Sequence, residues 1–208
     1  MEKQRSGGRK PIAGFVAAIS LCIGGALSAT QTASAADSAP PKVTIQTSMG
    51  DVVLELDREH TPKTVDNFLR YAKEGHFDGT VFYRVVPGFV IEGGSFDAEG
   101  KPRGVHDPIP LETAQAQTNM RGTITMAHGD DPNSARAEFF INLADNNSLN
   151  RQPDDMDNKT GFAVFGHVVD GMDVVDRISM VPLNGGKGPF PDAAPVTPVV
   201  INKVVVLN

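Results

Sequence analysis

The chain has 208 residues, of which 40% are hydrophobic and 21% are charged. This length and apolar fraction suit one globular domain with its own core, and they exclude a disordered chain or a coiled coil. Cys22 is the only cysteine, so we expect neither an internal disulfide nor a thiolate metal site.

The first 35 residues differ in composition from the rest. Basic residues occupy positions 3, 5, 9 and 10, and the uncharged stretch that follows contains Ala33-Ser34-Ala35 near its end. This order is typical of an export signal, so we expect residues 1–35 to be a signal peptide that is cleaved after Ala35. The alternatives are an uncleaved membrane anchor, disfavoured by the glycines and serines in the stretch, and a lipoprotein, disfavoured by the large Leu21 before Cys22.

The remainder of the chain is acidic. Without Glu2 and the four basic residues of the leader, it has 15 Lys and Arg against 24 Asp and Glu, a formal charge of −9. Such a surface repels the phosphates of nucleic acid and of anionic membranes. We therefore expect no nucleic-acid partner, and no stable membrane insertion once the leader is removed.

Residues 36–41 form a polar, proline-containing spacer. Beyond it, two runs rich in β-branched residues, 43–47 and 52–56, flank the turn-forming residues 48–51. This pattern predicts a β-hairpin, so the globular domain, 42–208, is expected to begin with two antiparallel strands.

One amphipathic helix is predicted next. Thr61 and Pro62 are a favourable start, apolar residues recur at helical spacing, and Gly75 predicts the end. Later β-rich runs predict strands at 80–86, 89–93, 121–127, 138–143, 162–168 and 196–207, and a second short helix is predicted at Met172–Ser179. Many strands with two helices indicate a mainly β protein, either a closed antiparallel barrel or a sandwich, and periodicity does not choose between them.

Arg84 lies within an apolar run, Phe82–Ile91, that would otherwise form part of a sheet core. A guanidinium keeps its charge and is costly to bury without a partner. We therefore expect Arg84 to have a carboxylate partner, a functional role, or both.

Three ordered segments carry a family resemblance. They are 82–94, then 121–127 together with 137–142, and finally 162–168. In order and spacing they closely resemble the cyclophilin family of peptidyl-prolyl isomerases, from about Lys42 to the C-terminus. The resemblance implies a closed eight-stranded antiparallel β-barrel capped by two α-helices, and an enzyme that needs no cofactor and no metal.

The resemblance also implies the site. Arg84 matches the catalytic arginine of the family. The substrate-binding positions match Phe89, Val90, Glu92, Ala127, His128, Glu138, Phe140, Leu149 and Phe162. Phe139 and Phe140 alternate along a strand, so only one of them can face the pocket.

Five positions depart from the family pattern. Glu92 and Glu138 stand where glutamines are usual, Ser148 replaces an aromatic residue, and Phe162 replaces a histidine. His128 replaces an asparagine whose backbone the family uses, so its role is expected to persist. An ionised glutamate only accepts hydrogen bonds, so Glu92 either fixes Arg84 more firmly or draws it away from the substrate. Glu138 is expected to favour peptides with a nearby Lys or Arg.

The five histidines have no metal-ligand spacing, and no serine lies in a nucleophile-elbow frame. Two functions from different classes remain. The first is an exported isomerase, similar to periplasmic cyclophilins of Gram-negative bacteria, which acts as a monomer on proline-containing unfolded polypeptides. The second is a cyclophilin-like module or chaperone that binds proline segments with little turnover.

Overall fold

Buried and more exposed residues alternate along the first two strands. In the computed structural model, which describes residues 39–152 and 160–207, β1 (Lys42–Thr47) pairs antiparallel with β2 (Gly50–Leu56). Every second residue is buried, as expected for strands with one face toward a core. The predicted hairpin is confirmed. The predicted signal peptide and residues 36–38 of the spacer lie outside the described residues.

The remaining elements follow the predicted order. The later strands are β3 (Thr80–Val86), β4 (Val90–Asp97), β5 (Thr123–Met126), β6 (Phe139–Asn142), β7 (Ala163–Asp170) and β8 (Val200–Leu207). The helices are α1 (Pro62–Lys73) and α2 (Met172–Ser179), with short 3₁₀ turns η2 (Asn147–Leu149) and η3 (Pro191–Ala193). β8 begins four residues later than predicted, after Pro198, because proline has no N–H to donate to a strand ladder.

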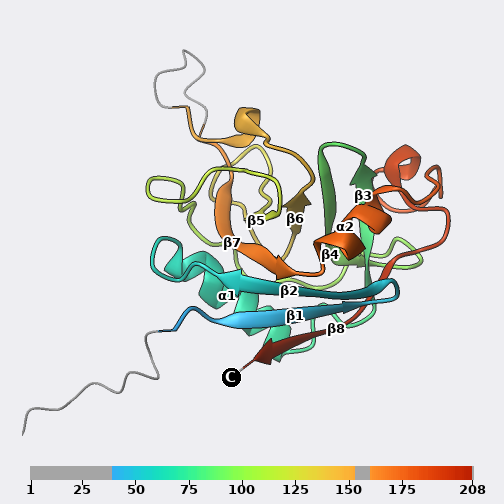
Figure 1. Cartoon of the computed structure of the whole chain (residues 1–208), viewed down its shortest axis with the longest axis horizontal. Coiled ribbons are helices and arrows are strands. Elements are labelled where there is room, and N and C mark those ends of the chain that lie inside the picture. The colour runs from blue at the N-terminus through green and yellow to red at the C-terminus, as the bar shows by residue number, and fades with distance from the viewer. Residues whose placement is uncertain (1–38, 153–159, 208) are drawn as a thin grey trace, which may run out of the picture. The chain divides into compact units, whose positions relative to one another are not determined.

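The strands close into a barrel in the order β1-β2-β7-β5-β6-β4-β3-β8. Each neighbouring pair is antiparallel, and Figure 1 shows the strands around the common core. The expectation of a closed eight-stranded barrel is therefore confirmed, and the sandwich alternative is wrong.

The helices pack against the barrel through apolar faces. Thr61 is the N-cap residue of α1 as predicted, but its hydroxyl donates to the Asp57 carbonyl, 2.9 Å away, rather than capping the helix. Phe68 on α1 packs against the rings of Phe139 and Phe165 in the core. α2 contacts β2, β3 and β4.

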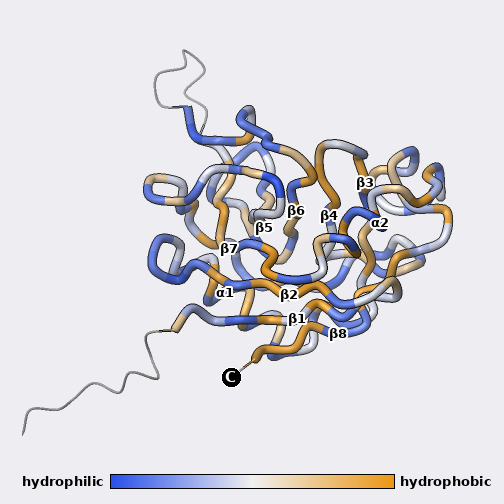
Figure 2. Tube along the Cα trace, in the orientation of Figure 1, coloured by the Kyte–Doolittle hydropathy of each residue, from blue (hydrophilic) through white to orange (hydrophobic). Residues whose placement is uncertain are grey.

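Apolar residues concentrate on the strands, and polar residues on the turns and loops between them (Figure 2). Inside the barrel, the completely buried side chains include Phe82, Ile91 and Phe139. Within residues 39–152 and 160–207, no helix is long and apolar enough to cross a membrane.

Candidate active site

A β-bulge in β3 decides where Arg84 points. Phe82 pairs with Gly93 and Arg84 pairs with Glu92, so Tyr83 is an extra residue on β3 with no partner of its own on β4. In a regular strand, residues two apart face the same side. The bulge breaks this rule: Phe82 is fully buried in the core, whereas the Arg84 side chain is 27% exposed. Arg84 therefore lies outside the apolar core although the residues around it in the sequence are apolar.

The strand register brings the predicted site residues into one row. Arg84 on β3 pairs with Glu92 on β4, which in turn pairs with Phe140 on β6. Directly opposed residues share a face of the sheet, so these three side chains lie on the outer face of the barrel. Two strand spacings are about 10 Å, roughly the length of three extended residues. The row is therefore the right size for a short peptide segment.

Arg84 has an ion-pair partner, as the sequence predicted. Its Nη1 donates to Glu92 Oε2 at 2.9 Å, and Tyr83 donates its hydroxyl to Glu92 Oε1 at 3.0 Å. Both carboxylate oxygens of Glu92 therefore accept a hydrogen bond. Because Glu92 is buried, these bonds are partly shielded from water. Burial, reinforced by the Glu92 charge, also raises the pKa of Tyr83 far above its usual value, which keeps the phenol protonated as a donor.

Glu138 lies close to this group but makes no ion pair with Arg84 among the described residues. Burial raises the pKa of Glu138 and the Glu92 charge raises it further, while the nearby Ser95 and Tyr83 hydroxyls lower it. The protonated form of Glu138 is thus favoured relative to a free glutamate. A protonated carboxyl can donate a hydrogen bond, as the glutamine usual at this position can.

The apolar residues among the predicted substrate-binding positions form one cluster, separate from the barrel core. Its buried members are Val90, Ala127 and Phe140, and the partly exposed residues packed on them are Phe89, Leu149 and Phe162. Phe139 belongs to the core cluster instead, so the prediction that only one of the two phenylalanines faces the pocket is confirmed. The structure therefore unites all six predicted apolar positions.

His128 supports one wall of this cluster. Its ring stacks on Phe162, with 4.3 Å between the ring centroids, and its Nε2 lies 2.9 Å from the Gly161 carbonyl oxygen. Phe162 in turn meets Phe140 edge to face at 5.8 Å. The His128 side chain therefore fixes the position of Phe162.

Buried amides hold two other walls of the cluster from behind. Asn119 donates to the Leu149 carbonyl at 3.2 Å, and Asn146 donates to the Phe89 carbonyl at 2.9 Å. Asn142 connects them, because its amide nitrogen donates to Asn119 and its oxygen accepts from Asn146. Buried polar groups that are all paired give a rigid support.

A cavity of about 50 Å³ lies elsewhere on the outer face of β3. It is lined by Tyr83, by the turn 97–100 and by the segment 183–198, and none of the six residues of the apolar cluster lines it. It is therefore distinct from the predicted proline pocket.

Sequence reasoning missed several residues that contact the site. Tyr83 neighbours Arg84 in the chain, but only the bulge shows that it serves Glu92. Phe190 lies over Arg84 from a distant proline-rich segment with no motif. The buried asparagines lie in regions that the sequence showed only as loops or strand ends, and no local signal predicts their network.

Comparison with known proteins agrees with this arrangement. The family model for cyclophilin-type peptidyl-prolyl cis-trans isomerases matches residues 42–206. A peptidyl-prolyl cis-trans isomerase of Streptomyces antibioticus is 43% identical over 166 residues, which covers 80% of this chain and 98% of that protein. Peptidyl-prolyl cis-trans isomerase B of Escherichia coli is 42% identical over 164 residues, covering 79% of this chain and 98% of that protein.

The fold has solved counterparts. A crystal structure of a cyclophilin-type isomerase of Cryptosporidium parvum, determined in the presence of the dipeptide Ala-Pro, superposes with a TM-score of 0.67. It is 24% identical and covers 80% of this chain and 99% of that chain. With the family match over nearly the whole described domain, the chain belongs to the cyclophilin-type peptidyl-prolyl cis-trans isomerases, a family of enzymes.

Proposed function

We propose that Arg84 carries the isomerisation and that the apolar cluster around Phe140 grips the proline ring. The observation that supports this assignment is the register row Arg84, Glu92, Phe140, which sets a cation and an apolar surface side by side on one face of the sheet. Glu92, Glu138, Ala127 and His128 complete the proposed substrate-binding surface around the cluster.

The reaction requires neither a nucleophile nor a cofactor. Amide resonance opposes rotation of an X-Pro bond with a barrier of about 18–20 kcal/mol, and the uncatalysed exchange takes roughly tens to hundreds of seconds. An enzyme accelerates it by binding the twisted amide more tightly than either planar form.

The twisted amide differs from the planar one at the prolyl nitrogen. When resonance is lost, that nitrogen regains a lone pair and accepts a hydrogen bond. A guanidinium held beside it then gains a charge-assisted bond that exists only in the transition state. The bond between Arg84 Nη1 and Glu92 keeps the guanidinium at the row of site residues, and the apolar cluster limits the movement of the ring.

We further propose that the substrates are proline-containing segments of exported polypeptides and that the protein acts in the periplasm as a monomer. The basic and apolar leader pattern at 1–35 supports export. The acidic remainder of the chain supports a role away from nucleic acid and anionic lipid.

Arg84→Ala tests the catalytic assignment. Loss of one preorganised donor typically costs about 10²–10³ in rate, so we expect a loss of that order in isomerisation of a single-proline peptide, measured by NMR exchange. Binding of the same peptide, measured by calorimetry, should change far less.

Arg177→Ala is the matched control. Arg177 is an exposed arginine on α2 that pairs with Asp173 at 2.6 Å and donates to the Met49 carbonyl in the turn between β1 and β2, so its removal should leave the exchange rate unchanged. A full rate in Arg84→Ala would refute the role of Arg84. A wild-type protein that binds the peptide without accelerating exchange would instead identify the binding module without turnover.

A further inference from the structure

Arg84 has a second neighbour besides Glu92. Its Cζ lies 5.0 Å from the centroid of the Phe190 ring, within the range of a cation–π contact. Phe190 also stacks on Tyr83, with 6.2 Å between the centroids and 11° between the ring planes. Tyr83 is the residue whose hydroxyl holds Glu92. Phe190 therefore contacts both the cation and the support of its carboxylate partner.

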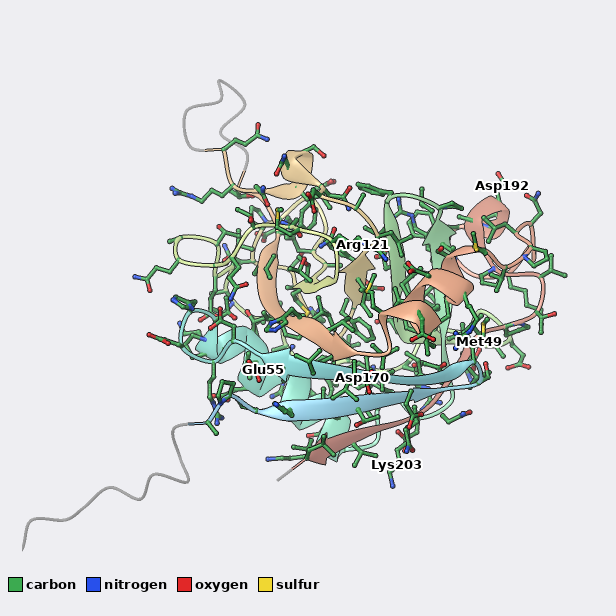
Figure 3. All side chains as sticks on the ribbon, in the orientation of Figure 1. Met49, Glu55, Arg121, Asp170, Asp192 and Lys203 are labelled. Atoms are coloured by element: carbon green, nitrogen blue, oxygen red, sulfur yellow. The ribbon has the colours of Figure 1, made fainter. Side chains whose placement is uncertain are left out.

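The segment that carries Phe190, 183–198, is closed on itself. Gly185 N donates to the Ala194 carbonyl at 2.9 Å, and Val196 N donates to the Pro182 carbonyl at 2.8 Å. These bonds bring the two ends of the segment together beside β3. Figure 3 locates the segment by its label Asp192, on the side of the domain where β3 lies. Its turn η3, which directly follows Phe190, contacts β3.

A second contact holds the segment against the turn after β4. Lys187 Nζ donates to the Ala98 carbonyl at 3.1 Å. A Cβ at Gly100 would lie 2.5 Å from Gly188 N, so the two backbones approach as closely as only glycine allows. Phe190 is thus presented to Arg84 from an anchored loop, although its own side chain remains accessible and the residue is 43% exposed.

We propose that Phe190 is a positioning residue for Arg84. Glu92 binds one edge of the guanidinium, and a hydrogen bond at one edge leaves the group free to tilt toward the carboxylate. The guanidinium carbon lies over the Phe190 ring, 5.0 Å from its centroid, so the ring opposes that tilt and the nitrogens not bonded to Glu92 stay available to the substrate. This proposal rests on Arg84 being the residue that stabilises the twisted amide.

The test is Phe190→Leu beside Phe190→Tyr. Leucine keeps the apolar bulk without a π-face, and we expect kcat and kcat/KM to fall together by roughly two- to fivefold, the size of an exposed cation–π contact. Tyrosine keeps the ring and should restore the rate. The ¹⁵N–¹H resonance of Arg84 Nε should shift in the leucine variant, because the ring current is lost, and should return in the tyrosine variant.

Two further variants separate this proposal from the one on Arg84. Val196→Ala changes an exposed side chain on the same segment and should leave the rate unchanged. In the Arg84→Ala background, Phe190→Leu should have no additional effect, because its partner is already absent. A leucine variant with full rate and an unshifted Nε resonance, in a protein that still needs Arg84, would overturn the inference. An additive loss in the double variant would also overturn it.

Discussion

Arg84 and the two glutamates near it form a charge arrangement with one cation and two acids. Glu92 is bonded to Arg84 and to Tyr83, which supports the first of the two roles considered for it, that of fixing the guanidinium. Glu138 has the opposite character, since burial and the neighbouring charge of Glu92 raise its pKa. The two acids therefore differ in their contacts: Glu92 accepts hydrogen bonds from Arg84 and Tyr83, whereas the surroundings of Glu138 favour its protonated form.

Glu138→Gln tests the role of that charge in substrate choice. At high pH the ionised Glu138 should attract a basic residue beside the proline, and as the pH falls the carboxyl takes up a proton and the attraction disappears. We expect the wild-type preference for a Lys peptide over a Glu peptide to rise by roughly two- to fivefold from pH 5 to pH 8, the size of a solvent-exposed charge pair. The variant should show no such rise in NMR exchange measurements. An equal pH trend in both proteins would contradict this role.

The same substitution has a predictable effect on stability. A carboxyl whose pKa is raised on folding stabilises the fold at low pH relative to high pH, and this contribution is lost as the pH rises through the folded pKa. Thermal unfolding of Glu138→Gln should therefore differ little from wild type below the ordinary glutamate value of 4.5. Above it, the variant should become progressively more stable than wild type.

Two irregular features of the fold create the site: a β-bulge in β3 and a network of buried asparagines. The bulge at Tyr83 turns Arg84 out of the barrel while Val85, one residue later, points back into the core and pairs with Ile91. Behind the apolar cluster, the buried asparagines link β6 to the ends of two loops. The regular barrel holds the strands in place. The bulge turns Arg84 outward, and the asparagine network fixes the residues of the apolar cluster.

Asn119→Ala tests the support behind the cluster. Asn119 is fully buried and bonds to the Leu149 carbonyl and to the Thr125 hydroxyl. Leaving such partners unpaired costs about 1–3 kcal/mol, so the midpoint of urea unfolding should fall accordingly. KM for proline peptides should rise, because the Leu149 wall loses its anchor.

Thr118→Ala is the neighbouring control for that experiment. Thr118 is exposed, and its side chain makes no hydrogen bond within the described part of the chain. Both stability and KM should stay at wild-type values. If Asn119→Ala lowers stability while KM stays constant, the network supports the fold but not the pocket.

The whole domain combines an enclosed core with a candidate site on the outside of the barrel. The barrel interior is filled by large apolar side chains, so the site we propose lies on the outer faces of β3, β4 and β6 and the loops beside them. This arrangement leaves the proline site open to long unfolded chains, whose ends need not pass through any channel. The role that we propose, isomerisation in unfolded exported polypeptides, requires that access.

Export itself is tested with the full-length chain in a Gram-negative host. We expect a periplasmic product that begins at Ala36 by mass spectrometry, because the small residues before that position suit signal peptidase. Ala35→Leu should block cleavage and keep the precursor in the membrane fraction. An uncleaved wild-type protein in that fraction would identify the alternative, a membrane anchor.

The order of elements could be predicted from the sequence because each depends on neighbouring residues. Alternating burial in β1 and β2, and the Thr61-Pro62 start and Gly75 end of α1, are local signals. The three segments that carry the resemblance also indicated the family and the six apolar substrate-binding positions. The choice between barrel and sandwich required the resemblance, since it depends on which strands pair.

The orientation of Arg84 and the contacts of Phe190 and Asn119 depend on segments that are far apart in the sequence. Whether Arg84 faces the core or the surface depends on the register between β3 and β4, and a one-residue bulge reverses it. Phe190 reaches Arg84, and Asn119 reaches Leu149, only after the barrel has closed and the loops have been anchored. Side-chain periodicity along a strand fixes which residues alternate, but pairing with another strand fixes which way they point, and pairing is a property of the folded chain alone.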